Sequence, residues 1–306
     1  MRLVLDARTA AFAALIDYAG LFPPASLSME DAVREYADAT ASPRSWAFGR
    51  FLCPASRLEE LAGVATSSFH RGDGGWSIGV VFDVDPGPSA AVAHDFNVEM
   101  SPAIEVSAAE ARITDPTPKG IGELIDTIGS IGTDVVAFLE VDRRSSITRQ
   151  VAATVTELAS RSRAGGAKIR CGGTTADLFP NVEEVTEFIV AASTNRLAFK
   201  ATAGLHQPVR HFDQELAVWR HGFVNILVAD AAADDGQSHS VVEAIVRETD
   251  PAAFSIGASM ARWKDVSIPG SALRRTRTNG FVAYGSCDLA EPTDALVDLG
   301  FFGEGT

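Results

Sequence analysis

Short apolar runs alternate along the chain with longer segments whose apolar residues recur at helical spacing. The runs are rich in β-branched and aromatic residues and predict strands, whereas the periodic segments predict helices. The first seven runs begin about 26 to 33 residues apart, the length of one strand–helix–strand unit. Eight strands alternating with helices favour an α/β fold with a single (β/α)8 barrel over an open sheet. The predicted strands are 46–53, 76–83, 102–107, 134–142, 167–171, 197–202, 223–229 and 281–287, and the clearest helices are 56–65, 119–131, 145–163 and 181–193.

The N-terminal part of the chain precedes this regular series. Residues 9–19 and 28–40 have helical character, and a Pro-Pro pair between them prevents one continuous helix. We therefore expect residues 1–45 to form an N-terminal helical extension packed on a barrel made of residues 46–306.

The closing strand of the barrel is less clearly marked than the others. Residues 249–280 do not fit one helix, so the count of strands near the C-terminus depends on 281–287. We expect 281–287 to close the barrel and a last helix to follow at 291–299. The alternative is a first strand near the N-terminal segment IDYAGLF.

Two neighbouring predicted strands carry cations on an unexpected face. Side chains alternate along a strand, so Lys168 and Arg170 share one face of AKIRC, and Lys200 lies on one face of LAFKAT. If helices cover the outside of the barrel, the apolar face points outward and the cations point inward. Buried cations are costly without partners or a ligand, so these strands form the predicted wall of an active site.

Further polar residues and glycines follow the predicted strand ends, which meet at one mouth of a barrel. Glu140 is expected inside, as a proton carrier or as a structural ion pair with Lys168. The glycine turns after the strands expose backbone N–H groups that suit an anion. The predicted catalytic residues are Lys200, Glu140 and Lys168, and the predicted substrate-binding residues are Arg170, Arg50, Gly172, Gly173, Thr202, Gly204, His206 and Ser286.

Composition narrows the classes of partner. The formal net charge of −14 argues against nucleic acid or an anionic membrane as the main partner, and a small anionic metabolite fits the cationic strands better. No apolar run reaches the length of a membrane span, and the N-terminus lacks a signal-peptide pattern, so we expect a cytoplasmic location. The oligomeric state stays open, and a homo-oligomer is compatible with the sequence.

The three cysteines indicate a reduced protein without a disulfide framework. Cys53, Cys171 and Cys287 end separate predicted strands with no close spacing, so a zinc site is disfavoured. A magnesium site from Glu105, Glu140 and Asp83 is conceivable, although nearby cations compete with it. We expect neither a metal nor a cofactor.

The segment FKATAGL, residues 199–205, resembles the motif around the Schiff-base lysine of deoxyribose-phosphate aldolases. The resemblance implies that Lys200 is the Schiff-base lysine of a class I aldolase-like lyase. That family places a second lysine on the following strand to lower the pKa of the first, whereas here the second lysine, Lys168, comes from the preceding strand. The phrases YAGLFPPA, FKATAGLHQPVR and YGSCDLAEP also resemble signatures of a bacterial (β/α)8-barrel family, without indicating a particular chemistry.

Three hypotheses follow from these residues. In the first, which we favour, neutral Lys200 attacks a carbonyl group, Glu140 moves protons, and Arg170 holds an acidic group of a phosphorylated or carboxylated metabolite. This requires Glu140 to pair with Lys168 or Arg170 rather than with Lys200. In the second, the same cations stabilise an oxyanion without a covalent step, as in an isomerase, decarboxylase or phosphoribosyltransferase. In the third, the charges form a closed salt-bridge layer in a non-catalytic binding barrel.

Overall fold

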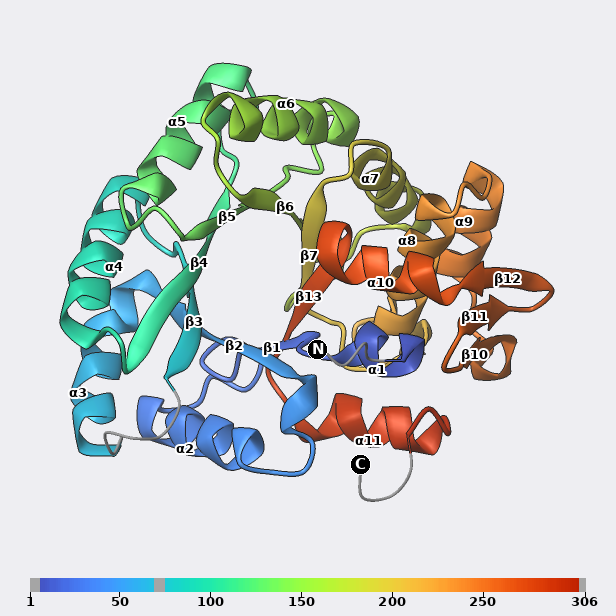
Figure 1. Ribbon diagram of the computed structural model, residues 1–306, viewed down its shortest axis with the longest axis horizontal. Coiled ribbons are helices and arrows are strands. Elements are labelled where there is room, and N and C mark those ends of the chain that lie inside the picture. The colour runs from blue at the N-terminus through green and yellow to red at the C-terminus, as the bar shows by residue number, and fades with distance from the viewer. Residues whose placement is uncertain (1–5, 69–74, 303–306) are drawn as a thin grey trace.

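The chain folds into a closed barrel of eight parallel strands, surrounded by helices (Figure 1). The computed structural model describes residues 6–68 and 75–302. The barrel order is β1-β13-β7-β6-β5-β4-β3-β2, with β1 hydrogen-bonded to both β13 and β2. The predicted (β/α)8 barrel is therefore confirmed. Its strands are β1 (Ile16–Tyr18), β2 (Phe48–Pro54), β3 (Trp76–Val81), β4 (Ile104–Arg112), β5 (Val136–Glu140), β6 (Gly165–Arg170), β7 (Ala198–Thr202) and β13 (Phe281–Ser286).

Helices cover the outside of the barrel, and polar caps mark where several of them begin. Asn181 forms a reciprocal capping box with Glu184, and the Thr117 and Ser146 side chains accept the N–H of the third residue of their helices. The helices are α1 (Ala7–Phe12), α2 (Met29–Thr40), α3 (Leu58–Ser68), α4 (Pro86–Met100), α5 (Pro118–Gly129), α6 (Ile147–Ser160), α7 (Val182–Thr194), α8 (Phe223–Asp234), α9 (His239–Arg247), α10 (Gly270–Asn279) and α11 (Ala290–Asp298), with short 3-10 turns η1 (Ser45–Ala47), η2 (Ala55–Arg57), η3 (Ala176–Leu178) and η4 (Pro251–Ala253). No helix of the described ranges is long and apolar enough to cross a membrane.

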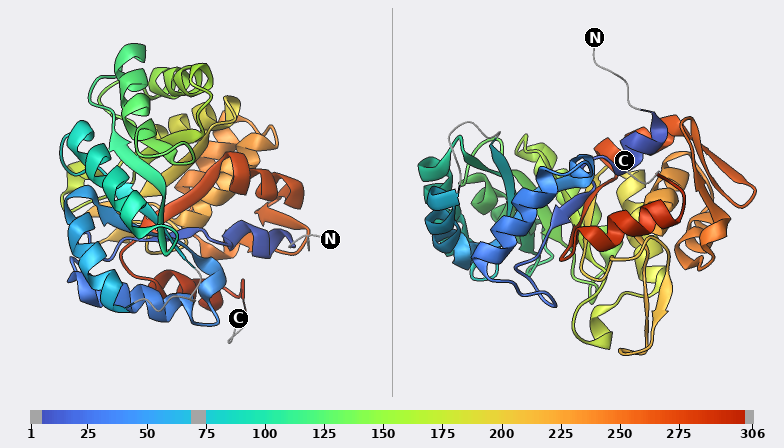
Figure 2. Two further views of the ribbon diagram at one scale, coloured as in Figure 1. Left: turned by 60° about the vertical axis from the view of Figure 1, so that its left-hand side comes forward. Right: turned by 90° about the horizontal axis from the view of Figure 1, so that it is seen from below.

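The connection from β7 to β13 is much longer than the others. It contains the hairpin β8 (His211–Asp213) and β9 (Val218–Arg220), the helices α8 to α10, and an antiparallel sheet of β10 (Phe254–Ile256), β11 (Met260–Trp263) and β12 (Val266–Pro269). As expected, residues 249–280 do not form one helix. Figure 2 shows that the β8–β9 hairpin projects from the end of the barrel opposite to α1.

The prediction of a strand at 223–229 is wrong, because this segment begins helix α8. Its residues are buried on every side, and so are those that follow as far as Ala232. An apolar run without a polar face has no helical periodicity, so pattern alone cannot separate a fully buried helix from a buried strand. α8 packs against α7, α9 and α10, which explains why no side of it is polar.

The eighth strand comes instead from the N-terminal part of the chain. β1 lies within IDYAGLF, the alternative site for a first strand, and pairs in parallel with β13 and β2. The expectation that residues 1–45 form only a helical extension is corrected accordingly, because this segment inserts a barrel strand between α1 and α2. Three residues are too short for alternation to identify them as a strand.

Strand β4 extends further than the prediction of 102–107. The longer strand places Glu110 opposite Phe138 of β5, with its side chain buried in the barrel, whereas Glu105 near its start is exposed. The inward acidic residue of this strand is thus Glu110 and not Glu105.

Candidate active site

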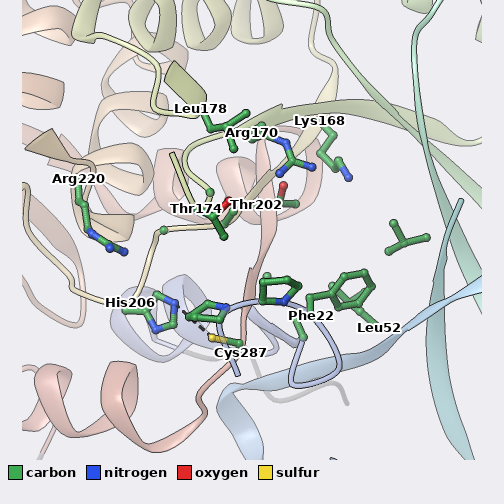
Figure 3. A pocket seen from close by; sticks show the side chains of 18 of the residues that line it. Phe22, Leu52, Lys168, Arg170, Thr174, Leu178, Thr202, His206, Arg220 and Cys287 are labelled. Atoms are coloured by element: carbon green, nitrogen blue, oxygen red, sulfur yellow. Dashed lines mark hydrogen bonds between the residues drawn. The ribbon is translucent and has the colours of Figure 1, made fainter. Parts of the chain in front are cut away.

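A cavity of about 500 Å³ opens at the C-terminal ends of the strands. Val81 and Thr202 line it from the ends of β3 and β7, and Cys287 lines it just beyond β13. Its wall is largely apolar and includes Phe22 and Leu52, while Lys168 and Arg170 extend into it from β6 (Figure 3). The position agrees with the usual place of active sites in such barrels.

The two lysines are held in the barrel by the pairing of β6 with β7. Lys168 lies directly opposite Lys200 in the register of these strands. The alternate residues face the helices, and the Phe199 ring packs edge to face on Phe188 of α7 with centroids 5.1 Å apart. The apolar face of each strand therefore fixes its lysine on the inner side, as the alternation predicted.

Three carboxylates surround the two ammonium groups. Lys200 is fully buried and donates to Asp17 of β1 and to Glu110 of β4. Lys168 lies 3.0 Å from Glu110 Oε2 and 2.9 Å from Glu140 Oε2. Glu110 therefore joins the two lysines into one network. We refer to Asp17, Glu110, Glu140, Lys168 and Lys200 as the lysine–carboxylate cluster.

Arg170 extends the cluster toward solvent. Its Nε lies 3.3 Å from Glu140 Oε1, and its side chain is 42% exposed, in contrast to the buried lysines. Glu140 thus pairs with Lys168 and Arg170 and has no ion pair with Lys200. This confirms the predicted partners of Glu140.

Burial and charge oppose each other at these groups. Burial acts to raise the pKa of Glu110, but Lys200 and Lys168 outweigh it and lower that pKa to about 2. The pKa of Glu140 is lowered because Lys168 and Arg170 outweigh its burial in the same way. The pKa of Lys168 is raised, since Glu140 and Glu110 more than offset the burial that would lower it. Both glutamates are therefore ionised at neutral pH, and Lys168 is an ammonium.

The outer part of the cavity carries polar groups from the loops. His206 Nδ1 lies 3.1 Å from Glu291 Oε2, and His206 Nε2 lies 3.6 Å from Cys287 Sγ. Arg220 of the β8–β9 hairpin also lines this part and pairs with Asp213. Arg170, Arg220 and His206 thus border the cavity, and each of them lies beside a carboxylate.

The structure brings most of the predicted site residues to one place. Lys200 and Glu140 lie in the cluster, with Lys200 beneath the surface of the cavity rather than on it. Gly204 adopts a left-handed conformation with φ of 74°, which glycine tolerates best, and so turns the chain after β7 along the cavity. The predicted residues that line the cavity are Lys168, Arg170, Gly173, Thr202, Gly204 and His206.

Three predicted substrate-binding residues lie outside this cavity. Arg50 comes early in β2 and lies in a second cavity at the other end of the barrel. Gly172 packs against the Phe179 ring, where a Cβ would approach a ring carbon to 2.9 Å. The Ser286 hydroxyl is buried and donates to the Asp288 carbonyl at 2.5 Å.

Asp17 and Glu110 are the functional candidates that the sequence analysis did not select. Asp17 interrupts the apolar segment LIDYAG, and Glu110 interrupts the small-residue segment SAAEAR. A lone carboxylate within an apolar run was the available signal for both. The pattern predicts a helix over 9–19 and ends the strand of β4 at 107, so neither carboxylate falls on a predicted strand.

The cysteines and acidic residues of the described ranges do not gather into a metal site. Cys53, Cys171 and Cys287 are free thiols, and Asp83, once considered a magnesium ligand, instead accepts hydrogen bonds from the Ser56 backbone and side chain. Within residues 6–68 and 75–302, no three His, Cys, Asp or Glu side chains are grouped so that they could hold a metal ion.

Two sequence comparisons give no relative for this chain. Neither a scan of protein-family models nor a search of curated proteins finds a match for the chain. Fold and site together define a (β/α)8 barrel with a charged cavity at its C-terminal face, which is consistent with an enzyme. Because barrels support many chemistries, the reaction has to be argued from the lysine–carboxylate cluster.

Proposed function

We propose that the protein is a lyase that forms a Schiff base between Lys168 and the carbonyl group of a small anionic metabolite. The observation that carries this proposal is the position of Lys168. It lines the cavity at the base of the mouth, and its amine has two carboxylates within 3.0 Å. A nucleophilic lysine needs access to the substrate and an acceptor for its proton, and Lys168 has both.

Lys200 fits a supporting role better than the nucleophilic role that its sequence motif implied. Its side chain is fully buried, and its amine is enclosed by Asp17, Glu110 and the Phe138 ring, whose centroid is 5.4 Å away. A carbonyl substrate in the cavity does not reach an amine in that position. Its positive charge, shared through Glu110, instead opposes the protonation of Lys168.

The charge balance of the cluster supports proton loss from Lys168. Asp17, Glu110 and Glu140 carry three negative charges. Three positive charges, not counting Lys168, come from Lys200, Arg170 and Arg50. The Arg50 guanidinium lies 3.9 Å from the Asp17 carboxylate. Loss of the Lys168 proton out of the cluster leaves three negative and three positive charges, whereas its transfer to Glu140 keeps the net charge unchanged, so neither step adds to the charge imbalance of the buried groups.

Glu140 is the proposed proton carrier. It takes a proton from the Lys168 ammonium, and the neutral amine adds to the substrate carbonyl carbon. The nitrogen proton moves to the oxygen to give a carbinolamine. Glu140 then returns its proton to the carbinolamine hydroxyl, which leaves as water, and an iminium ion remains. When the bond between the α carbon and the neighbouring hydroxyl-bearing carbon breaks, the iminium accepts its electron pair, Glu140 takes the hydroxyl proton, and the departing fragment leaves as an aldehyde. Glu140 returns this proton to the enamine carbon, and water hydrolyses the resulting iminium to release the second product and free Lys168.

The cavity favours a small substrate with an acidic group. Its volume of about 500 Å³ and its apolar wall suit a short carbon chain. Arg170 is the accessible cation nearest Glu140 and, as a planar guanidinium, can hold a phosphate or carboxylate through two hydrogen bonds. The turns at Gly173 and Gly204 place backbone atoms on the wall of the same cavity.

A second candidate function uses the same residues without a covalent bond. The raised pKa of Lys168 favours it, because Glu140 and Glu110 outweigh burial and keep the amine protonated at neutral pH. An ammonium there stabilises the oxyanion formed when Glu140 removes a proton next to a carbonyl group, as in an isomerase or decarboxylase. The two functions differ in whether the enzyme bonds to the substrate.

Reductive trapping separates these two functions. The protein is incubated with acetaldehyde, glycolaldehyde or glyoxylate and cyanoborohydride, and its intact mass is measured. The mass of a Schiff-base enzyme rises rapidly by one reduced aldehyde adduct, and the Lys168→Met variant does not show this rise. Arg149→Gln, an exposed cation change on α6 outside the cavity, is the matched control and keeps the wild-type rate. Labelling that is equally slow in the wild type and in Lys168→Met contradicts the Schiff-base function.

A further inference from the structure

A second cavity, of about 730 Å³, lies at the N-terminal end of the barrel. It is lined by residues at the beginnings of strands, including Val136 of β5, Ala198 of β7 and Val282 of β13, and by Ala13 and Ala14 just before β1. It therefore lies at the α1 end of the barrel, opposite the β8–β9 hairpin (Figure 2). It shares no lining residue with the cavity at Lys168.

Four arginines line this cavity, namely Arg50, Arg163, Arg196 and Arg277, and no acidic side chain of the described residues lines it. This concentration of positive charge is unexpected in a chain with a formal net charge of −14. Arg163, Arg196 and Arg277 form no ion pair within the described part of the chain, whereas exposed arginines such as Arg34 and Arg275 do. Unpaired cations gathered around a cavity are the usual arrangement for binding an anion.

Arg277 provides a second indication of a missing acceptor. Its terminal nitrogens donate to the carbonyls of Phe281, at 2.5 Å, and of Ala13, at 2.9 Å, which fixes the guanidinium at the cavity wall. Its Nε is shielded from solvent and has no hydrogen-bond partner among the described residues. Burial lowers the pKa of Arg277 to about 10, which still leaves it charged at neutral pH. A buried donor without an acceptor is costly, and a bound anion would relieve part of that cost by its charge.

We propose that this cavity is a binding site for a small anion with two negative charges, a phosphate ester or a dicarboxylate. Arg277 and Arg163 are already oriented by backbone carbonyls, with Arg163 donating to Gly129, Gly132 and Thr133. Arg196, in the loop before β7, and Arg50, in β2, also line the cavity. The proposal of this anion site does not depend on Schiff-base formation by Lys168.

Arg50 connects the proposed anion site with the lysine–carboxylate cluster. Its Nε donates to Ser107 at 2.8 Å, and its Nη1 lies 3.9 Å from Asp17 Oδ2. Asp17 in turn accepts a hydrogen bond from Lys200. An anion at the N-terminal end therefore competes with Asp17 for the guanidinium of Arg50, so removal of the Asp17 charge should tighten anion binding.

Isothermal titration calorimetry with inorganic phosphate, and separately with malonate, tests the site. The key variant is Arg196→Asn, because Arg196 is exposed and has φ of 52°, a backbone conformation that asparagine tolerates. Loss of one charged contact should weaken binding about tenfold or more. Asp17→Asn should strengthen it, and Arg149→Gln should leave it unchanged. A preference for phosphate over malonate, or the reverse, assigns the class of anion.

Arg170→Gln decides which cavity the anion occupies. The proposed active site also takes an anion at Arg170, so the test follows the binding event that Arg196→Asn weakens, and that event should persist in Arg170→Gln. Binding lost in Arg170→Gln and kept in Arg196→Asn overturns the proposal. Absence of binding in the wild type at millimolar phosphate and malonate also overturns it, and would mean that the arginines only close the barrel end.

Discussion

Lys168 and Lys200 lie opposite each other on neighbouring strands and share one carboxylate, that of Glu110. One lysine borders the cavity and the other is fully enclosed. Sharing Glu110 means that each ammonium receives less than a full negative charge from it, and Asp17 or Glu140 supplies the remainder. The pair therefore combines an amine at the cavity wall with a fixed positive charge behind it.

Lys200→Met should destabilise the protein strongly. The substitution leaves the buried Asp17 without its lysine partner and removes one of the two cations at Glu110. Loss of one partner from a buried ion pair costs about 3–5 kcal/mol, so the free energy of unfolding in urea should fall by that amount. The double variant Asp17→Asn/Lys200→Met should lose less than Lys200→Met alone. A loss below about 1 kcal/mol for Lys200→Met would show that Lys200 is not a charged partner of Asp17 and Glu110 in the folded protein.

Stability at acidic pH should report on Glu110. Its pKa is lowered from 4.5 to about 2, because Lys200 and Lys168 outweigh its burial. A lowered carboxyl pKa gives stability that is complete above the unfolded value and is lost as pH falls from about 4.5 toward 2, on the order of 3 kcal/mol in size. Urea unfolding at pH 6, 4 and 3 should show this loss in the wild type.

The control for the acid effect is Glu105→Gln, an exposed change on the same strand, which should keep the wild-type pH dependence. Glu110→Gln should be less stable at pH 6 and should show a flatter dependence between pH 4.5 and 3. An equally steep dependence in Glu110→Gln would assign the acid loss to other carboxylates.

Arg170→Gln should affect an anionic aldehyde and leave a neutral one unchanged. If Arg170 holds the acidic group, the glyoxylate concentration that gives half-maximal trapping should rise about tenfold or more, since one charged contact is lost. Acetaldehyde has no such group, so its trapping rate should stay within about twofold. Equal effects on both aldehydes would indicate that Arg170 orients Glu140 and does not contact the substrate.

Much of the barrel could be predicted because apolar residues recur with different periods in its strands and in its helices. Runs such as 167–171 and 197–202 are short, apolar and followed by glycine turns, and both are barrel strands. The segment 223–229 was mistaken because a helix buried on all sides has no polar face. β1 was uncertain because its three residues are too few to show alternation, although its sequence was recognised as the alternative strand.

The site was predictable where alternation applied and was missed where the strand limits were wrong. The inward position of Lys168, Lys200 and Glu140 follows from side-chain alternation alone. Glu110 was missed because β4 continues beyond the predicted end at 107, and Asp17 was missed with β1. Which lysine reaches the cavity depends on how Asp17 and Glu110, from distant parts of the chain, enclose Lys200, and local sequence does not contain that information.

The position of the trapped adduct is the most direct test of the central claim. The wild-type protein is reduced with cyanoborohydride in the presence of glyoxylate, digested, and mapped by peptide mass spectrometry. We expect the carboxymethyl group on Lys168, with Lys200 unmodified because it is fully buried between Asp17 and Glu110. An adduct on Lys200, or an equal distribution over surface lysines such as Lys119 and Lys264, would contradict the assignment of Lys168 as the nucleophile.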